Sequence, residues 1–180
     1  MNDASRERRF EVEAMPHIKA AYELARWLTG SSQDAEDVVQ ESYLRAYQFF
    51  DGWRGGSARP WLLAIVRNTA FTWLERNRPR HVAPMSPDAL AAACELAFLR
   101  GEIVAPTPEH EALAVAERSE LLSVLAQLPA LFREIIVLRE LQELSYREIA
   151  AIIAVPEGTV MSRLARARAE LRRLWLKRNR

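Results

Sequence analysis

Arginines near the C-terminus are the residues of this sequence best suited to bind a polyanion. From residue 158 to residue 180 the chain carries eight Lys and Arg residues and one acid, Glu170. Arginine can bind guanine through two hydrogen bonds or hold a phosphate, so this cluster predicts contact with DNA. The alternative interpretation is a solvated basic helix that ends a domain.

The sequence around these arginines predicts the element that positions them. SYRE at 145–148 is a capping box that opens a short helix. Residues 156–158 (PEG) are expected to break it, and Thr159 to cap the next helix. Two short helices joined by a tight turn, the second one basic, are typical of a helix-turn-helix. The apolar stripe of the second helix is Val160, Leu164, Ala167, Leu171 and Leu174.

The second helix of this motif offers two kinds of DNA contact. Ser162, Arg166 and Arg173 fall near one helical face, with Arg163 beside them. The N-terminal part of such a helix normally enters the major groove. Residues further along, which suit phosphate contacts, are Arg168, Arg172 and Lys177.

A second set of charges lies in the first half of the chain. Residues 34–51 hold five acids and one arginine, whereas residues 52–80 hold six arginines and one acid. The basic stretch also contains Trp53, Trp61, Phe71 and Trp73. Arginines interleaved with aromatic rings favour unpaired nucleic acid, although tryptophans at helical spacing also suit a core. The acidic helix is either a solvated face or a docking site for a basic protein surface.

Composition limits what else the protein can do. The net charge of +1 is the sum of +1 over residues 1–80, −5 over residues 81–120 and +5 over residues 121–180. The single cysteine, Cys94, excludes an intrachain disulfide and a cysteine-based zinc site. The three histidines are scattered, and no nucleophile–base pair or phosphate-binding glycine motif is present, so we expect neither an enzyme nor a cofactor, metal or small-molecule substrate. No apolar run suits a membrane span or signal peptide, so we expect no membrane insertion and a cytoplasmic location.

Apolar residues recur at three- and four-residue spacing, which predicts an all-α fold of two small helical domains joined by a linker. In the first domain, residues 8–80, we expect a helix over 16–28 ended by Gly30. Ser31 or Ser32 then caps a helix reaching Phe50, and Pro60 lies in the first turn of a third helix. The second domain, residues 110–177, starts with an amphipathic helix over 113–128 and a second helix that begins at Pro129.

Residues 81–109 read as a linker rich in proline. It is more apolar than a plain flexible linker, and Ala89–Leu99 could form a short helix. We expect it to pack between the domains or against an inhibitor. The apolar residues concerned are Leu90, Leu96, Phe98, Leu99, Ile103 and Val104.

Four segments together resemble the extracytoplasmic-function sigma factors of bacterial RNA polymerase. They are DAEDVVQESYLRAY at 34–47, WLLAIVRNTA at 61–70, LSYREIAAI at 144–152 and PEGTVMSRLARAR at 156–168. The resemblance covers about residues 12–80 and 112–175. Each segment alone is moderately specific, whereas four in this order and spacing are highly specific.

The resemblance implies a role for each group of residues. The acidic helix would bind core RNA polymerase through Asp34, Asp37, Gln40 and Glu41. The loop at 55–59 and the helix after it would capture the unpaired −10 element of promoter DNA through Arg59, Trp61, Arg67, Asn68, Trp73 and Arg76. The C-terminal helix would read the −35 element through Thr159, Ser162, Arg163, Arg166, Arg168 and Arg173. An anti-sigma factor is a further expected partner.

One position departs from the family pattern. Met161 stands where the family usually has a basic residue, which removes one expected phosphate or base contact. A plain helix-turn-helix regulator that binds duplex DNA without polymerase would explain residues 145–175 equally well, but not the acidic helix followed by the Trp/Arg helix. A regulatory protein with relic DNA determinants is the third alternative.

Overall fold

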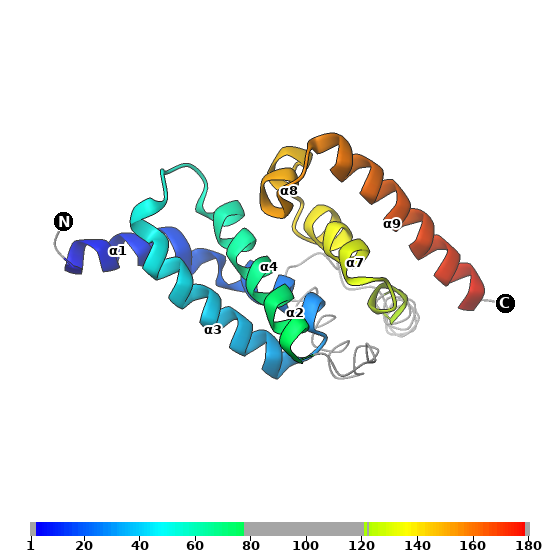
Figure 1. Ribbon diagram of the computed structural model, residues 1–180, viewed down its shortest axis with the longest axis horizontal. Coiled ribbons are helices and arrows are strands. Elements are labelled where there is room, and N and C mark those ends of the chain that lie inside the picture. The colour runs from blue at the N-terminus through cyan, green and yellow to red at the C-terminus, as the bar shows by residue number, and fades with distance from the viewer. Residues whose placement is uncertain (1–2, 78–120, 122, 179–180) are drawn as a thin grey trace, which may run out of the picture.

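The computed structural model describes residues 3–77, 121 and 123–178, and every regular element in these ranges is a helix. This confirms the predicted all-α class. The short apolar helix expected in the linker, together with Cys94, lies outside the described residues. Figure 1 shows the N-terminal helices on one side of the molecule and the C-terminal helices on the other.

Three N-terminal helices pack on one another around a shared core. They are α2 (Ile18–Thr29), α3 (Ser32–Phe49) and α4 (Ala58–Asn77). Short 3₁₀ turns, η1 (Met15–His17) and η2 (Phe50–Gly52), precede α2 and follow α3. The fully buried side chains of this bundle include Leu24, Leu28, Phe50, Leu62 and Leu63.

The boundaries of these helices follow local chemistry. Gly30 ends α2 with a φ of 78°, a left-handed conformation that glycine adopts without strain. Ser31 caps α3, because its side chain accepts a hydrogen bond from the Asp34 N–H at 3.4 Å. Pro60 lies in the first turn of α4, where its missing N–H costs nothing. These three predictions are confirmed.

The first helix of the structure, α1 (Asp3–Ala14), was not predicted. Its sequence, DASRERRFEVEA, is strongly polar and lacks an apolar stripe wide enough to predict a core-facing helix. Only Phe10 and Ala14 are buried. Helical structure therefore begins before residue 8, where the first domain was expected to start.

The C-terminal helices are α7 (Ala130–Ile136), α8 (Tyr146–Ile153) and α9 (Glu157–Arg178). Pro129 precedes α7 as predicted, and a π-helical turn, η3 (Val137–Leu141), extends it. Of the helix expected over 113–128, residues 123–126 are helical, and most of the rest lies outside the described residues. The α9 stripe faces inward, with Val160, Leu164 and Ala167 buried and Leu171 and Leu174 half-buried.

The predicted start of α9 was wrong by three residues. Thr159 does not cap the helix but lies within its first turn, because α9 begins at Glu157. The Thr159 and Val160 N–H groups both donate to the Pro156 carbonyl, at 2.9 and 3.2 Å. The break falls instead at Ala154, which ends α8 with a φ of 54°. Gly158 is tolerated because the first turn of a helix needs few intrahelical hydrogen bonds.

The capping box at the start of α8 is confirmed. The Ser145 hydroxyl accepts a hydrogen bond from the Glu148 N–H at 3.3 Å, and the Ser145 N–H donates to the Glu148 carboxylate at 2.9 Å. The Ser145 hydroxyl also donates to that carboxylate, and these bonds lower the pKa of Glu148. The resulting stability is present above the ordinary pKa of glutamate and is lost as the pH falls through the lowered value.

We predict that Ser145→Ala lowers the free energy of unfolding of the C-terminal domain by about 1 kcal/mol, the usual cost of losing an N-cap. Urea denaturation followed by circular dichroism at pH 7 measures this change. Ser123→Ala removes a hydroxyl that accepts a hydrogen bond from Arg178 but caps no helix, and it is the matched control. Equal stability of the two variants would show that the box contributes nothing.

Candidate DNA and polymerase interfaces

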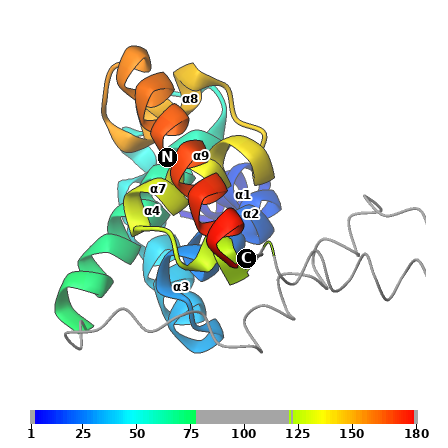
Figure 2. The same ribbon diagram turned by 90° about the vertical axis from the view of Figure 1, so that its right-hand side faces the viewer.

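The N-terminal part of α9 presents most of the expected −35 residues to solvent. Ser162 and Arg166 are exposed, whereas Thr159 and Arg163 are half-buried. Met161 is 55% exposed, so at this position the helix offers a thioether instead of a cation. Figure 2 views the molecule with α9 in front of the other helices. The described geometry leaves this part of α9 open to a duplex.

Two arginines expected to contact DNA are paired with acids. Arg168 donates to the Glu140 carboxylate of η3 at 3.2 and 2.5 Å. Arg173 pairs with Glu170 on the same helix at 2.6 Å. Ion pairs this exposed contribute about 0–1 kcal/mol, so a phosphate can replace either acid at small cost.

The loop between η2 and α4 is anchored by an aromatic cluster. Phe50 is buried and stacks on Trp53, with ring centroids 5.6 Å apart. Trp61 lies 6.2 Å from Phe50 and 6.0 Å from Trp53. Both tryptophans are half-buried, so Trp61 packs against the loop and has only part of its ring available to a base.

The tip of the same loop is shaped by two glycines. Gly55 and Gly56 both have a φ of 86°, which only glycine adopts without strain. A Cβ on either residue would meet nothing within 4 Å, so backbone conformation and not crowding requires glycine here. Figure 1 shows the loop standing clear of the helices at the end of α3. This open loop lies next to Arg59, the first arginine of α4.

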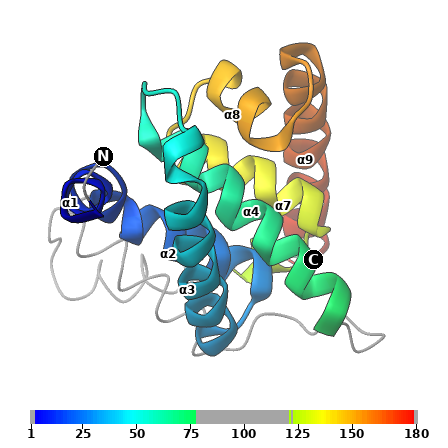
Figure 3. The same ribbon diagram turned by 60° about the vertical axis from the view of Figure 1, so that its left-hand side comes forward.

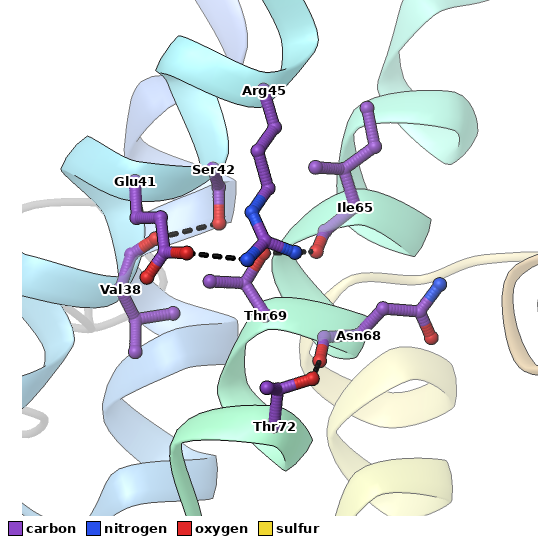
Figure 4. A network of polar contacts seen from close by, with 8 residues as sticks. All are labelled: Val38, Glu41, Ser42, Arg45, Ile65, Asn68, Thr69 and Thr72. Carbon is purple, nitrogen blue, oxygen red and sulfur yellow. Dashed lines mark hydrogen bonds and ion pairs between the residues drawn. The ribbon is translucent and has the colours of Figure 1, made fainter.

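Along α4 the side chains expected to bind the −10 element differ in solvent exposure and in their contacts. Asn68 and Arg76 are exposed, and Trp73 is half-buried. Figure 4 shows the Asn68 side chain pointing away from α3. Arg67 is half-buried, with its guanidinium 4.7 Å above the Phe71 ring and 3.1 Å from the Asn68 side-chain oxygen.

Arg59 and Arg67 are both held by the C-terminal helices. Arg59 donates to the backbone and side-chain oxygens of Gln142 at 2.9 and 2.7 Å. The Gln142 amide in turn donates to Glu23 of α2 at 2.7 Å. Arg67 forms an ion pair with Glu134 of α7 at 2.5 Å. Figure 3 shows α4 running alongside α7, where these contacts form. In this closed arrangement neither arginine is free to contact DNA.

The Arg67–Glu134 contact is a buried ion pair. The Glu134 side chain is completely buried, and its Oε2 has no hydrogen-bond partner. Burial raises its pKa, while Arg67 and the nearby Arg163 oppose that change. A buried pair contributes little net stability, but removing one partner leaves a charge without compensation. Glu134 thus lies between one candidate −10 residue and one candidate −35 residue.

The acidic residues predicted to bind polymerase lie on α3. Asp37 and Gln40 are exposed, and Asp34 is half-buried. Glu41 forms an ion pair with Arg45, whose side chain extends toward α4 in Figure 4. Leu44 is 62% exposed and lies one turn beyond Gln40, so an apolar side chain continues the acidic stripe. This composition suits docking on a basic protein surface that has an apolar centre.

Sequence reasoning missed the residues that join the two halves. Glu23 and Glu134 are buried polar residues in helices predicted to be amphipathic, and Gln142 is a buried polar residue just after η3. A polar residue at a core-facing position is the only signal that could have marked them, because buried polar groups need partners.

Of the helices described, none is long and apolar enough to span a membrane.

Comparison with known proteins identifies the class of this fold. The profile of sigma-70 region 2 matches residues 14–80, and the profile of sigma-70 region 4 matches residues 118–171. The chain is 42% identical to the ECF RNA polymerase sigma-E factor of Salmonella typhi over 139 residues, 76% of this chain and 71% of that protein. It is 38% identical to the sigma-E factor of Haemophilus influenzae over 152 residues, 83% of this chain and 78% of that protein. The chain belongs to the extracytoplasmic-function sigma factors.

Two solved structures share the fold. The sigma factor RpoE of Bartonella quintana, in complex with the anti-sigma factor NepR, is 24% identical, with a TM-score of 0.64 over 96% of this chain and 99% of that one. CnrH, in complex with the cytosolic domain of CnrY, is 26% identical, with a TM-score of 0.61 over 93% of this chain and 88% of that one. Family membership sets aside a helix-turn-helix regulator that acts without polymerase.

Proposed function

We propose that this protein is a dissociable subunit that binds core RNA polymerase, recognises the −35 and −10 elements of a promoter and promotes melting of the DNA. The observation that carries this proposal is the presence of three separate surfaces in one chain. They are the acidic stripe of α3, the loop with the arginine-bearing face of α4, and the basic helix α9. A regulator of duplex DNA would need only the last of these.

The first surface would hold the polymerase. Asp37, Gln40 and the exposed Leu44 lie on one side of α3, away from the core residues Val38 and Val39. Charge complementarity speeds association and excludes wrong partners, while a central apolar side chain contributes affinity. Glu41 would exchange Arg45 for a cation on the polymerase, which costs little because the pair is exposed.

The second surface would hold the melted −10 strand. The open loop at 53–57 can receive a base turned out of the duplex, and Asn68 can read a base edge through a donor and an acceptor. Arg76 and the released Arg59 and Arg67 would follow the phosphates of the strand. Capture of an unpaired base stabilises the open form of the promoter. Binding of this strand therefore promotes melting of the DNA.

The third surface would read duplex DNA at the −35 element. Ser162, Arg163 and Arg166 are near the end of α9 that enters the major groove, while Arg168 and Arg173 lie further along it. Base contacts specify sequence, whereas phosphate contacts fix the register of the protein on the duplex. With Met161 neutral, Arg163 and Arg166, which follow it, would supply most of the charge at this end.

We predict that Arg166→Ala weakens binding to the −35 element by about 1–3 kcal/mol and relaxes the base preference at one position. Fluorescence anisotropy on a promoter selected from a random library measures both effects. Arg172→Ala, an exposed arginine further along α9, is the control expected to weaken all sequences equally. An unchanged base preference in the Arg166 variant would assign this residue to the backbone or to solvent.

The closed arrangement implies that the two halves must separate before the −10 strand can bind. Arg59 and Arg67 would have to leave Gln142 and Glu134, and polymerase binding would supply the free energy through contacts made only by the open form. The sigma factor RpoE of Bartonella quintana was solved in complex with the anti-sigma factor NepR, which supports an anti-sigma factor as a partner that holds this chain closed. The proposed role needs no catalysis by this chain and is exercised in the cytoplasm, where the polymerase acts.

Run-off transcription tests the proposed function. Core polymerase is mixed with the chain and with a library-selected promoter, and the start site of the product is mapped. We expect a single start site that depends on the chain. Tight binding to duplex DNA without any transcript would favour a plain regulator instead.

A further inference from the structure

Helix α1 lies outside every part of the chain that the comparisons assign to a functional region. The region 2 profile begins at residue 14, where α1 ends. The helix is polar and mostly exposed, so core burial alone does not explain its position. It packs on α4, and its polar and aromatic side chains contact the end of α3 and η2, the turn that leads into the candidate −10 loop.

Arg6 makes the polar part of this contact. Its Nη2 donates to the Tyr47 carbonyl at 2.6 Å, and its Nε lies 3.0 Å from the Asp51 carboxylate. The guanidinium also lies 4.3 Å above the Tyr47 ring. The Tyr47 carbonyl belongs to the last turn of α3, where it also accepts a hydrogen bond from the Phe50 N–H and where a cation is favoured. One side chain thus joins α1 to the end of α3 and to η2.

Phe10 and Arg9 make the rest of the contact. The Phe10 ring meets Tyr47 and Phe50 edge to face, with both centroid distances at 5.2 Å. The Arg9 guanidinium lies 4.8 Å above the Phe50 ring. Phe50 in turn stacks on Trp53, the residue at which the loop begins. An unbroken series of contacts therefore runs from α1 through Phe50 to the loop.

We propose that α1 braces the −10 loop and that Arg6 is a positioning residue for recognition of the melted strand. The proposal rests on the proposed function, because it assigns α1 to the same site. The loop has two residues in left-handed conformations and is exposed at its tip. Its geometry therefore depends on how η2, the turn from which the loop starts, is held. Arg6 holds η2 in place and does not itself face the DNA strand.

The central variant is Arg6→Ala, and Arg8→Ala is its matched control. Arg8 is an exposed arginine on the same helix, so its loss changes the charge and the helix equally without touching η2. Arg6→Lys keeps the charge that faces Asp51 but cannot stack on Tyr47 as a planar group. This third variant separates loss of charge from loss of the brace and covers the case in which the alanine variant folds poorly.

Two measurements test the proposal on the full chain. Hydrogen exchange of the free chain should show amides in residues 50–57 exchanging about tenfold faster in Arg6→Ala, with α2 and α4 unchanged. In open complexes with core polymerase, the Arg6→Ala variant should keep its affinity for the −35 element. Its preference for the selected −10 sequence over a substituted one should fall about tenfold. We expect Arg6→Lys to recover part of each effect and Arg8→Ala to behave as the unchanged chain.

The outcomes separate this proposal from the function on which it rests. If the unchanged chain opens the promoter and Arg6→Ala keeps both its −10 preference and its loop protection, α1 is no brace and the proposed function stands. If Arg6→Ala and Arg8→Ala lose −10 preference equally, the effect is one of charge, and the positioning role is wrong. If the unchanged chain opens no promoter, both proposals fail together.

Discussion

Replacing Glu134 by alanine is expected to open the free chain and to increase its affinity for a single-stranded −10 oligonucleotide by about tenfold or more. Arg67→Ala should also open the chain, yet it should abolish most of this affinity. The two variants remove opposite ends of one buried ion pair. Loss of either partner costs the closed form about 3–5 kcal/mol, because the other charge stays buried without compensation.

The direction of the DNA effect distinguishes the two variants. In the Glu134 variant Arg67 is released to solvent and can bind phosphate, whereas in the Arg67 variant the DNA-binding cation is gone. Small-angle scattering measures the opening, and fluorescence anisotropy with a labelled oligonucleotide measures the affinity. Glu75→Ala removes an exposed acid of α4 and controls for the change in charge. A Glu134 variant that stays compact and binds no better would show that the pair does not restrain the −10 surface.

The second large effect is expected at the polymerase surface. Asp37→Arg should weaken binding to core RNA polymerase by about 2–5 kcal/mol, since it replaces an attractive contact with repulsion from a basic partner. The Asp37 side chain is exposed, so the free energy of unfolding should change by less than about 0.5 kcal/mol. Surface plasmon resonance with immobilised core polymerase measures the affinity, and thermal unfolding measures the stability.

Glu11→Arg provides the control for this experiment. It makes the same change in charge at an exposed position on a different helix, α1. We expect this variant to bind polymerase as the unchanged chain does. Equal loss in both variants would mean that net charge, and not the stripe on α3, determines the affinity.

Much of the fold could be predicted because its signals are local. Gly30, Ser31 and the Ser145 capping box each act on backbone groups within a few residues, so the sequence alone identifies them. The start of α9 was harder to predict. Proline followed by glycine reads as a break, yet the Pro156 carbonyl accepts the first hydrogen bonds of the helix, and the break lies at Ala154.

The contacts between distant segments could not be predicted in the same way. Arg59 and Arg67 read as free cations for DNA, but their partners Gln142 and Glu134 are 83 and 67 residues away along the chain. No periodic pattern encodes such a pairing. Similarly, α1 has too few apolar residues to predict a packed helix, and its position depends on Arg6, whose partners follow about forty residues later.

Promoter opening by the complete chain with core polymerase tests the account most directly. A fluorescent base analogue in the −10 element reports melting, and the promoter is one selected by the chain from a random library. We expect the signal to rise only when the chain and core polymerase are both present, and to be lost in Arg67→Ala. Melting by core polymerase alone, or full melting by the Arg67 variant, would contradict the assignment of this chain and of its −10 surface.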